Sequence, residues 1–419
     1  MKKIIDYLYS LRNQGSSYGI ERMEMLLEKL GIKSLPFPVI HVAGTNGKGS
    51  TCAMLDSIYR ANGYKVGLFS SPHLVHLGER VRINGKILSE EKLIRHLRVI
   101  RPLAEEIEKE VEGMHPSFFE IITAIAFCEF SQVKVDLAVI ETGLGGRLDS
   151  TNVVVPEISI ITTISLDHCH ILGNTIEEIA FEKAGIVKKG CPVVTGWLPD
   201  AANEVIRKIA LERGASFYTL AKQSSQQDLP ETNLVGEHQN RNAALAVKVT
   251  QILKENFPVK EEKLDSGLQT VKLEGRWQVL QDNPMIILDA CHNKEGATVL
   301  IKQLAQLPKN MKLVVWFGSL GEERAKEILS VLTQFASEIR LFKPKQPRAC
   351  SLKALRSLIC PTFSGKVLKG EVEKIDSHFN AIHSGQILLI TGSIYLLGEI
   401  MEVVKKPKNN LGLSFQDLV

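Results

Sequence analysis

The glycine-rich segment at residues 44–50 is the strongest chemical signal in the sequence. It reads Gly44-Thr45-Asn46-Gly47-Lys48-Gly49-Ser50 and stands between an apolar run and a helical pattern. Glycines let backbone N–H groups approach phosphate oxygens, and the start of a helix adds its positive dipole end. Lys48 can neutralise phosphate charge, and a Ser50 or Thr51 hydroxyl can hold Mg²⁺. The segment predicts a nucleotide phosphate loop, although Gly49 separates the lysine from the hydroxyl; a glycine-rich turn without a ligand is the alternative.

Three further polar clusters each follow an apolar run: Ser70-Ser71-Pro72, Glu141-Thr142-Gly143 and Asp167-His168-Cys169-His170. Ligands of an open parallel sheet gather at the carboxyl ends of its strands, so we expect these clusters near the phosphates. Glu141 is suited to hold a metal ion there, and His168 could support Mg²⁺ beside it. The run at 167–170 also contains zinc ligand types, but adjacent positions rarely converge on one ion. A histidine satisfied within the core is the structural alternative for His168.

Short apolar runs alternate with helical patterns through most of the chain, which predicts an α/β fold. The first series has a helix at 49–61 and strands at 38–42, 65–69, 136–140 and 158–164. The second has a helix at 296–306 and strands at 285–288, 313–317 and 387–390. Continuous apolar runs indicate strands covered on both faces, as in a parallel sheet. We predict a P-loop domain with a mostly parallel sheet over residues 1–275, followed by a smaller Rossmann-like domain over 276–419.

The composition is that of a soluble globular protein. The chain has 419 residues, 44% apolar and 23% charged, with a formal net charge of +4. These values exclude wholesale disorder and a polytopic membrane protein, and the length favours two domains. A nucleic-acid binder would show a clustered basic excess, so we expect no nucleic-acid partner.

The seven cysteines are scattered and lack the spacing of a disulfide framework or a structural zinc site. A charge interrupts the first residues before any apolar run develops, and no run is long enough to cross a membrane. We therefore expect a cytoplasmic protein without a membrane partner. Because no coiled coil or long exposed apolar helix demands a partner chain, we expect a monomer.

The motifs taken in order resemble the folylpolyglutamate synthases and bifunctional dihydrofolate synthases of the Mur ligase superfamily. The segments that carry the resemblance are 44–50, 70–74, 141–149, 167–173 and 179–186. The resemblance extends from about residue 15 to 399, and the additional Gly49 favours the folate ligases over the cell-wall ligases.

The resemblance implies a set of ATP and metal ligands. It implies two Mg²⁺ ions held by Ser71, Glu141, His168 and Lys183, with Lys183 carbamylated; without that modification Lys183 would be a helix-surface lysine. Lys48, Lys183 and His168 would be the catalytic residues. The ATP-binding residues would be Thr45, Asn46, Gly47, Lys48, Gly49, Ser50, Asn242, Arg276, Asp289 and His292. Ala290-Cys291 departs from the Gly-Ala more usual in the family. A surface salt bridge for Arg276 and a helix cap for Asp289 are the structural alternatives.

The resemblance also implies a pterin-binding wall. Its residues would be Ser17, Tyr18, Gly19, Ser117, Phe118, Phe119, Glu120, Leu148, Asp149 and Ser150. Aromatic rings can stack on a flat heterocycle, and a carboxylate can accept hydrogen bonds from a ring amino group. Either phenylalanine could instead be a core residue at the start of a helix.

The function so implied is that of an ATP-dependent amide ligase. It would add L-glutamate to dihydropteroate, to folates, or to both, through an acyl phosphate, and act only on small molecules. Three alternatives remain at this point: a cell-wall Mur-type amino-acid ligase, a P-loop ATPase or GTPase switch, and a catalytically silent scaffold. Dependence of ADP release on glutamate and on a pteroate distinguishes them.

Overall fold

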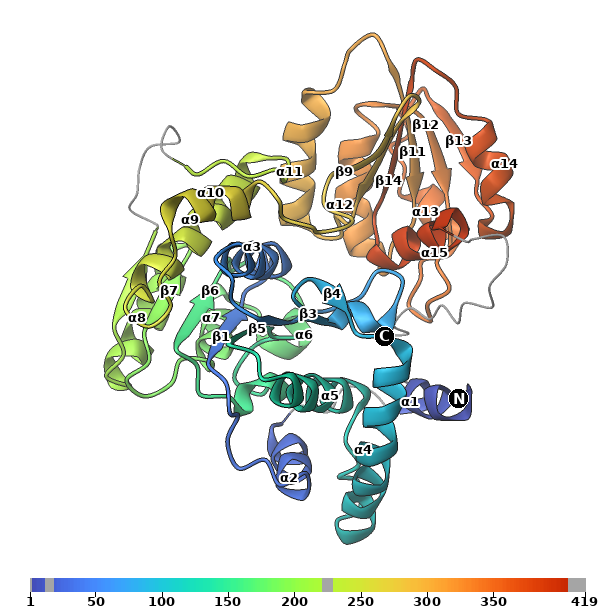
Figure 1. Ribbon diagram of the computed structural model, residues 1–419. Helices are drawn as coiled ribbons and strands as arrows, with labels where there is room; N and C mark the ends of the chain where they lie inside the picture. Colours follow the sequence, from blue (N-terminus) through green and yellow to red (C-terminus); the bar gives the residue numbers. More distant parts are fainter. Residues whose placement is uncertain (1, 12–18, 221–228, 406–419) are drawn as a thin grey trace. The chain divides into compact units, whose positions relative to one another are not determined.

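The computed structural model describes residues 2–11, 19–220 and 229–405, which form two compact units (Figure 1). The first comprises Met1–Pro72 and Gly78–Lys272, and the second comprises His73–Leu77 and Leu273–Val419. The division thus falls near the junction expected at 275/276, but it also assigns His73–Leu77 to the second unit. Leu74 and Val75 explain this assignment, because both are buried within an apolar core of the second unit.

The sheet of the first unit is mostly parallel. In the described residues it has eight strands in the order β4-β3-β2-β5-β1-β6-β7-β8. The strands are β1 (Val39–Ala43), β2 (Val66–Phe69), β3 (Val81–Ile83), β4 (Lys86–Ile87), β5 (Leu137–Glu141), β6 (Ile158–Ile161), β7 (Val193–Thr195) and β8 (Phe217–Thr219). The β2–β3 and β3–β4 pairs at one edge are antiparallel, and the other pairs are parallel. The predicted α/β class with a mostly parallel sheet is confirmed.

Helices cover both faces of this sheet. Its described helices are α1 (Lys2–Ser10), α2 (Glu21–Lys29), α3 (Lys48–Ala61), α4 (Glu90–Glu110), α5 (Phe118–Val133), α6 (Cys169–Leu172), α7 (Ile176–Ala184), α8 (Asp200–Glu212), α9 (Glu237–Ile252) and α10 (Glu261–Leu268). Two 3₁₀ turns, η2 (Leu77–Arg80) and η3 (Ser150–Val153), complete the described helical segments before Lys272. α3 packs on β1, β2 and β5 from one side, and α5 lies across the other side (Figure 1).

The second unit has its own sheet, with six strands among the described residues in the order β13-β12-β11-β14-β10-β9. The strands are β9 (Gln278–Asp282), β10 (Met285–Asp289), β11 (Lys312–Phe317), β12 (Ala336–Leu341), β13 (Lys366–Lys369) and β14 (Gln386–Thr391). Only the β9–β10 pair among them is antiparallel. This arrangement agrees with the expected Rossmann-like sheet.

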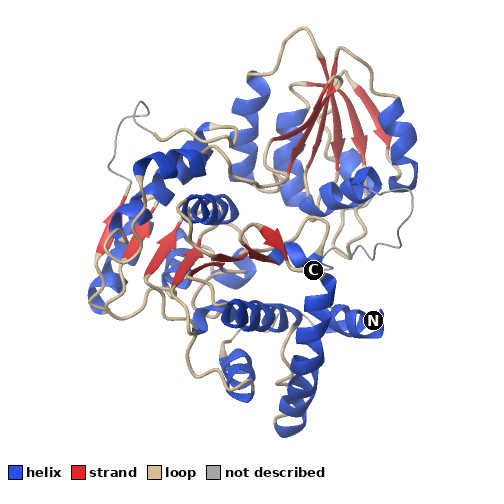
Figure 2. Cartoon of the chain, in the orientation of Figure 1, coloured by secondary structure: helices blue, strands red, loops and turns tan. Residues whose placement is uncertain are grey.

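Helices flank the sheet of the second unit (Figure 2). Alternate residues of its central strands enter two separate cores. Ile287, Val315 and Leu389 face one core, whereas Leu288, Trp316 and Leu388 face the other. Helices cover both cores. The described helices of the second unit are α11 (Lys294–Ala305), α12 (Glu322–Leu332), α13 (Leu352–Ser357), α14 (Ile375–Asn380) and α15 (Ile394–Lys405), with the 3₁₀ turn η5 (Val372–Lys374). Across the described ranges, no helix is long and apolar enough to cross a membrane.

Candidate active site

The glycine-rich segment forms a tight loop between β1 and α3, the context that phosphate binding requires. Gly47 precedes the first residue of α3 with φ 81°, a left-handed conformation that side chains other than glycine rarely adopt. A Cβ atom on Gly47 would lie 2.6 Å from Oδ1 of Asn242 on α9. The structure therefore brings Asn242, which is distant in sequence, directly against the loop.

Threonines that follow β6 hold the loop in place. The amide of Thr45 donates to the carbonyl of Thr163 at 2.8 Å, and the amide of Asn46 donates to the Thr163 hydroxyl at 2.9 Å. The Thr162 hydroxyl donates to the Asn46 carbonyl at 2.6 Å. Thr162 and Thr163 were expected to belong to a strand running to 164, but β6 ends at Ile161 because these residues turn to bind the loop. Sequence reasoning missed their supporting role.

Lys48 folds back over the loop that precedes it. Its Nζ donates to the carbonyls of Gly44 at 3.0 Å and Thr45 at 3.3 Å. Ser50 and Thr51, one turn into α3, are buried, and the Thr51 hydroxyl has no hydrogen-bond partner among the described residues. The ammonium group and these hydroxyls thus occur together at the start of α3.

Glu141 and Ser71 meet at the carboxyl ends of adjacent strands. The Ser71 amide donates to Oε2 of Glu141 at 3.1 Å, and Glu141 is buried at the end of β5. A Cβ atom on Gly49 would lie 3.8 Å from the same Oε2, so the carboxylate borders the glycine loop. Three of the predicted positions therefore converge, as the rule for parallel sheets anticipates.

Lys183 is buried beside the same loop. Only 3% of the residue is exposed, and its Nζ donates to the Gly44 carbonyl at 2.9 Å. Burial lowers the pKa of Lys183 to about 7, and the positive charge of Lys48 acts in the same direction. The negative charges of Asp167 and Asp149 oppose that shift. The alternative of a helix-surface lysine is excluded by this burial.

His168 follows the threonines after β6 and is only partly buried. Its backbone is left-handed, with φ 52°, and its amide donates to Oδ1 of Asp167 at 2.9 Å. Its ring centroid lies 6.3 Å from that of His170. No group of three or more His, Cys, Asp or Glu side chains in the described ranges has the arrangement of a metal site, so the zinc alternative gains no support.

The predicted pterin wall is only partly described. Ser17 and Tyr18 lie outside the described residues, whereas the Gly19 amide donates to the Leu148 carbonyl at 3.4 Å. This contact brings the amino-terminal segment to the segment at 148–150.

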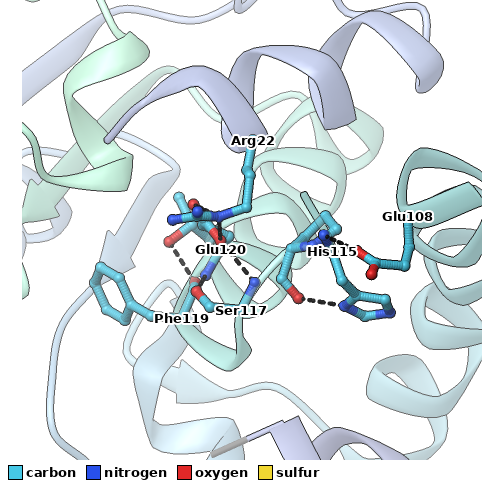
Figure 3. Close-up of polar contacts among 8 residues, drawn as sticks. Arg22, Glu108, His115, Ser117, Phe119 and Glu120 are labelled. Carbon is cyan, nitrogen blue, oxygen red and sulfur yellow. Dashed lines mark hydrogen bonds and ion pairs between the residues drawn. The ribbon is translucent and has the colours of Figure 1, made fainter. Parts of the chain in front are cut away.

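Glu120 is engaged in a buried ion pair (Figure 3). Nε of Arg22 donates to its two carboxylate oxygens at 3.2 and 3.1 Å, and the Ser117 amide donates to Oε2 at 2.6 Å. Ser117 in turn caps α5 by accepting from the Glu120 amide, which completes a capping box. Through these contacts Glu120 and Ser117 stabilise the start of α5. Arg22 was not singled out from the sequence, because its partner is far along the chain.

The two phenylalanines differ in environment. Phe118 is buried and stacks on Tyr9 with a centroid separation of 6.2 Å, as a core residue would. Phe119 is partly exposed, and its ring points away from the Arg22–Glu120 pair (Figure 3). A Cβ atom on Gly143 would lie 2.6 Å from the Phe119 ring, so a larger residue at this position would displace the ring. Phe119 is therefore the better placed of the two for stacking on a ligand.

Asp149 closes the loop that follows Glu141. Its Oδ2 accepts from the Leu144 amide at 2.8 Å, and its Oδ1 accepts from the Thr151 amide at 3.0 Å. Burial raises the pKa of Asp149, and the hydrogen bonds to its carboxylate counteract that shift. Ser150, the next residue, is also buried, at the start of η3.

In the second unit, Asp289 ends β10 and organises the chain around it. Its carboxylate accepts from the amides of Trp277 and Cys291, each at 3.0 Å. Burial raises the pKa of Asp289, and the positive charge of Arg276 opposes the shift, so these two predicted residues interact. Nδ1 of His292 lies 2.9 Å from the Ala290 carbonyl. Cys291 is buried in the core that also contains Trp277.

Comparison with known protein families and structures identifies both units. Residues 42–259 match the Mur ligase middle domain, and residues 275–394 match the Mur ligase glutamate ligase domain. The dihydrofolate synthase/folylpolyglutamate synthase of Bacillus subtilis is 36% identical over 93% of this chain and 96% of its own length. The Escherichia coli protein of the same name is 31% identical over 96% of this chain and 94% of its own length.

Solved structures agree in fold. Folylpolyglutamate synthase from Thermotoga maritima superposes with a TM-score of 0.83 and 32% identity, covering 97% of both chains. The Escherichia coli enzyme solved with DHPP and ADP gives a TM-score of 0.82 at 30% identity, covering 96% of this chain and 97% of that chain. The chain therefore belongs to the dihydrofolate synthase/folylpolyglutamate synthase family of ATP-dependent Mur ligases.

Proposed function

We propose that this protein uses ATP to join L-glutamate to the carboxylate of dihydropteroate, of a folate, or of both. The observation that carries the proposal is the convergence of Glu141 and the buried Lys183 on the glycine loop. A carboxylate such as Glu141 can hold Mg²⁺ in any nucleotide-binding protein of this kind, but nucleotide binding alone does not need a buried amine such as Lys183. A buried amine in contact with the loop backbone indicates chemistry beyond simple nucleotide binding.

Relatives support the choice of substrates. Proteins named dihydrofolate synthase/folylpolyglutamate synthase match nearly the whole chain. Related structures contain ADP with DHPP, or ADP and AMPPCP, which supports ATP as the nucleotide and a pteroate as the acceptor. We propose small molecules as the only substrates and a monomer as the working form.

The reaction must first make the substrate carboxylate a good acyl donor. A carboxylate oxygen attacks the γ-phosphorus of ATP in line, ADP leaves, and an acyl phosphate forms. The amine of glutamate then attacks the acyl carbon, the amide bond forms, and phosphate departs with the former carboxylate oxygen. The loop amides and Lys48 would hold the phosphates throughout, while Asn242 would contact the nucleotide. In the second unit, Arg276 and Asp289 would bind ATP, and His292 would lie beside them.

The residues around the loop fit magnesium. Ser71 and Glu141 meet beside Gly49, and oxygen donors are the ligands that Mg²⁺ prefers. We propose that Ser71, Glu141, His168 and a carbamylated Lys183 hold two Mg²⁺ ions. The ions would neutralise charge on the phosphoryl group during transfer.

Carbamylation of Lys183 is chemically reasonable in this position. Because burial lowers the pKa of Lys183 to about 7, much of the amine is neutral near neutral pH. A neutral amine can add carbon dioxide and release a proton, which gives an anionic carbamate with oxygen donors. The product would replace a poorly solvated ammonium by a group able to bind a metal ion.

One assay separates this function from its alternatives. ADP release is measured with dihydropteroate, tetrahydrofolate or a muramyl substrate, each with and without glutamate. The proposal predicts release only when a pteroate or folate and glutamate are both present. Release with the muramyl substrate would indicate a cell-wall ligase, and release without any acceptor would indicate an ATPase.

A further inference from the structure

A chain of three buried polar side chains lies behind the loop that follows Glu141. His41 on β1 is fully buried, and its Nε2 lies 2.8 Å from the Thr151 hydroxyl. The Thr151 hydroxyl lies 2.5 Å from Oδ1 of Asp149. His41 and Thr151 have no role in the proposed reaction, yet both are polar groups at positions where apolar residues would ordinarily be favoured.

The direction of the hydrogen bonds follows from the partners of Asp149. Its carboxylate accepts from the amides of Leu144 and Thr151 and also from the Thr151 hydroxyl, since an ionised carboxylate has no proton to donate. That hydroxyl has a single proton, and Nε2 of His41 must therefore donate to its oxygen. Nδ1 of His41 is then a bare acceptor. It has no partner among the described residues, and an unpaired acceptor is better tolerated than an unpaired buried N–H.

The environment of His41 keeps the ring neutral. Burial lowers the pKa of His41 to about 3, and the positive charge of Lys188 acts in the same direction. A neutral ring with its proton on Nε2 is the form that the hydrogen-bond chain needs.

We propose that His41 and Thr151 are positioning residues for the ligase site. Together they fix the orientation of Asp149, whose carboxylate holds the Leu144 amide and with it the loop at 142–146. The other side of this loop packs against Phe119, whose ring occupies the space that a side chain at position 143 would need. The loop that leaves Glu141 is thus clamped between Asp149 and Phe119, and we infer that the clamp sets the shape of the pteroate wall.

The kinetic test compares Thr151→Val with Thr151→Ser and rests on the proposed function. Valine has nearly the same shape but removes the hydroxyl and with it the hydrogen bonds to Asp149 and His41. We expect the KM for the pteroate substrate to rise about tenfold, because Asp149 loses the contact that orients its carboxylate. The KM for ATP should stay within about twofold, because the glycine loop is held by other residues. Thr151→Ser should restore the wild-type KM for the pteroate.

Thr250→Val is the matched control. Thr250 is buried in α9, and its hydroxyl donates only to the Val247 carbonyl of the same helix among the contacts described. This variant should keep the wild-type KM for both substrates. An unchanged pteroate KM in Thr151→Val, or an equal rise in Thr250→Val, would overturn the proposal.

His41→Leu is a second variant, which tests the proposal even if Thr151→Val fails to fold. His41→Leu removes the donor and also the unpaired Nδ1, so the protein should still fold while the pteroate KM rises as in Thr151→Val. His41→Gln, whose amide can reach the position of Nε2, should recover part of the loss. A folded His41→Leu protein with wild-type KM would contradict the positioning role.

A spectroscopic test is independent of the reaction. Long-range ¹H–¹⁵N spectra of the histidine-labelled protein, with His41 assigned from the signals lost in His41→Leu, report which ring nitrogen carries the proton. We expect a neutral ring protonated at Nε2 throughout the range from about pH 6 to pH 8, since ordinary histidines titrate there. A proton on Nδ1, or a ring that titrates in this range, would overturn the hydrogen-bond chain even if the proposed ligase activity were absent.

Discussion

Two lysines contact the backbone of the same loop in different surroundings. Lys48 is partly exposed, and its ammonium contacts the Gly44 and Thr45 carbonyls. Lys183 is almost completely buried and contacts the Gly44 carbonyl from α7. The first can neutralise phosphate without a large desolvation cost, whereas the second is held in an environment that favours its neutral form.

Lys48→Ala should lower the rate of glutamate-dependent ADP release by about a hundredfold or more, because the positive charge expected to face the transferred phosphoryl group is lost. The thermal midpoint should change little, since the side chain is partly exposed and bonds only to nearby loop carbonyls among the contacts described. Steady-state kinetics and thermal unfolding measure the two effects. Near-normal turnover in a folded variant would refute the phosphate-loop assignment.

Lys183→Ala should also lose activity, because the proposed carbamate would be absent. Added short carboxylates, such as formate or acetate, should restore part of it by supplying oxygen donors to the vacated position. Lys189→Ala, which removes an exposed lysine just beyond α7, is the control and should remain fully active without additives. Full activity of Lys183→Ala without any carboxylate would remove Lys183 from the mechanism.

At the scale of elements, α15 of the second unit buries an unusual carboxylate. Oε1 of Glu399 accepts from the Lys345 amide at 2.5 Å, and Oε2 has no partner among the described residues. Burial raises the pKa of Glu399 to about 7, and the negative charges of Glu402 and Glu373 add to the effect, whereas Lys345 opposes it. The folded protein therefore holds a proton on Glu399 at pH values where the unfolded chain has lost it.

This proton makes stability depend on pH. The contribution of protonated Glu399 to the free energy of unfolding is fully present below the ordinary glutamate pKa of about 4.5. It is lost as the pH rises through about 7. The free energy of unfolding of the second unit should thus fall between about pH 5 and pH 8, by roughly 2–3 kcal/mol. Denaturant unfolding at both pH values should show this fall in the wild type and in Glu323→Gln, which alters an exposed glutamate of α12, but not in Glu399→Gln. An equal fall in Glu399→Gln would contradict the assignment.

Elements with continuous apolar runs were predictable, and marginal ones were not. β1, β5 and β10 have strongly apolar sequences because helices cover both their faces. β12 and β13 were missed because they are only partly buried and carry charged residues. β6 was predicted too long, because Thr162 and Thr163 favour strands by residue type but bind the glycine loop instead.

The same contrast holds for the candidate site. Glycine-loop residues and Glu141 could be predicted because each lies in a short motif at the end of a strand. Arg22, Thr151 and His41 could not, because each acquires its role from a partner far away in the sequence. The burial of Lys183 was likewise invisible in the sequence, where a lysine near the end of a helix usually faces solvent.

At the scale of the whole molecule, two α/β units divide the expected tasks. The first contains the glycine loop with Glu141, Asn242 and Lys183, and the second contains Arg276 and Asp289. A net charge of only +4 fits this division, because the positive charge needed for anionic substrates is supplied by a few placed side chains. We predict ATP-binding residues in both units, and the ligase reaction would depend on them.

An isotope-transfer experiment tests that reaction most directly. Dihydropteroate labelled with oxygen-18 in its carboxylate is incubated with ATP, Mg²⁺ and glutamate, and the released phosphate is analysed by mass spectrometry. An acyl phosphate intermediate predicts that labelled oxygen appears in phosphate in proportion to the amide bonds formed. Phosphate that carries no label, released whether or not glutamate is present, would contradict the account and leave a nucleotide hydrolase.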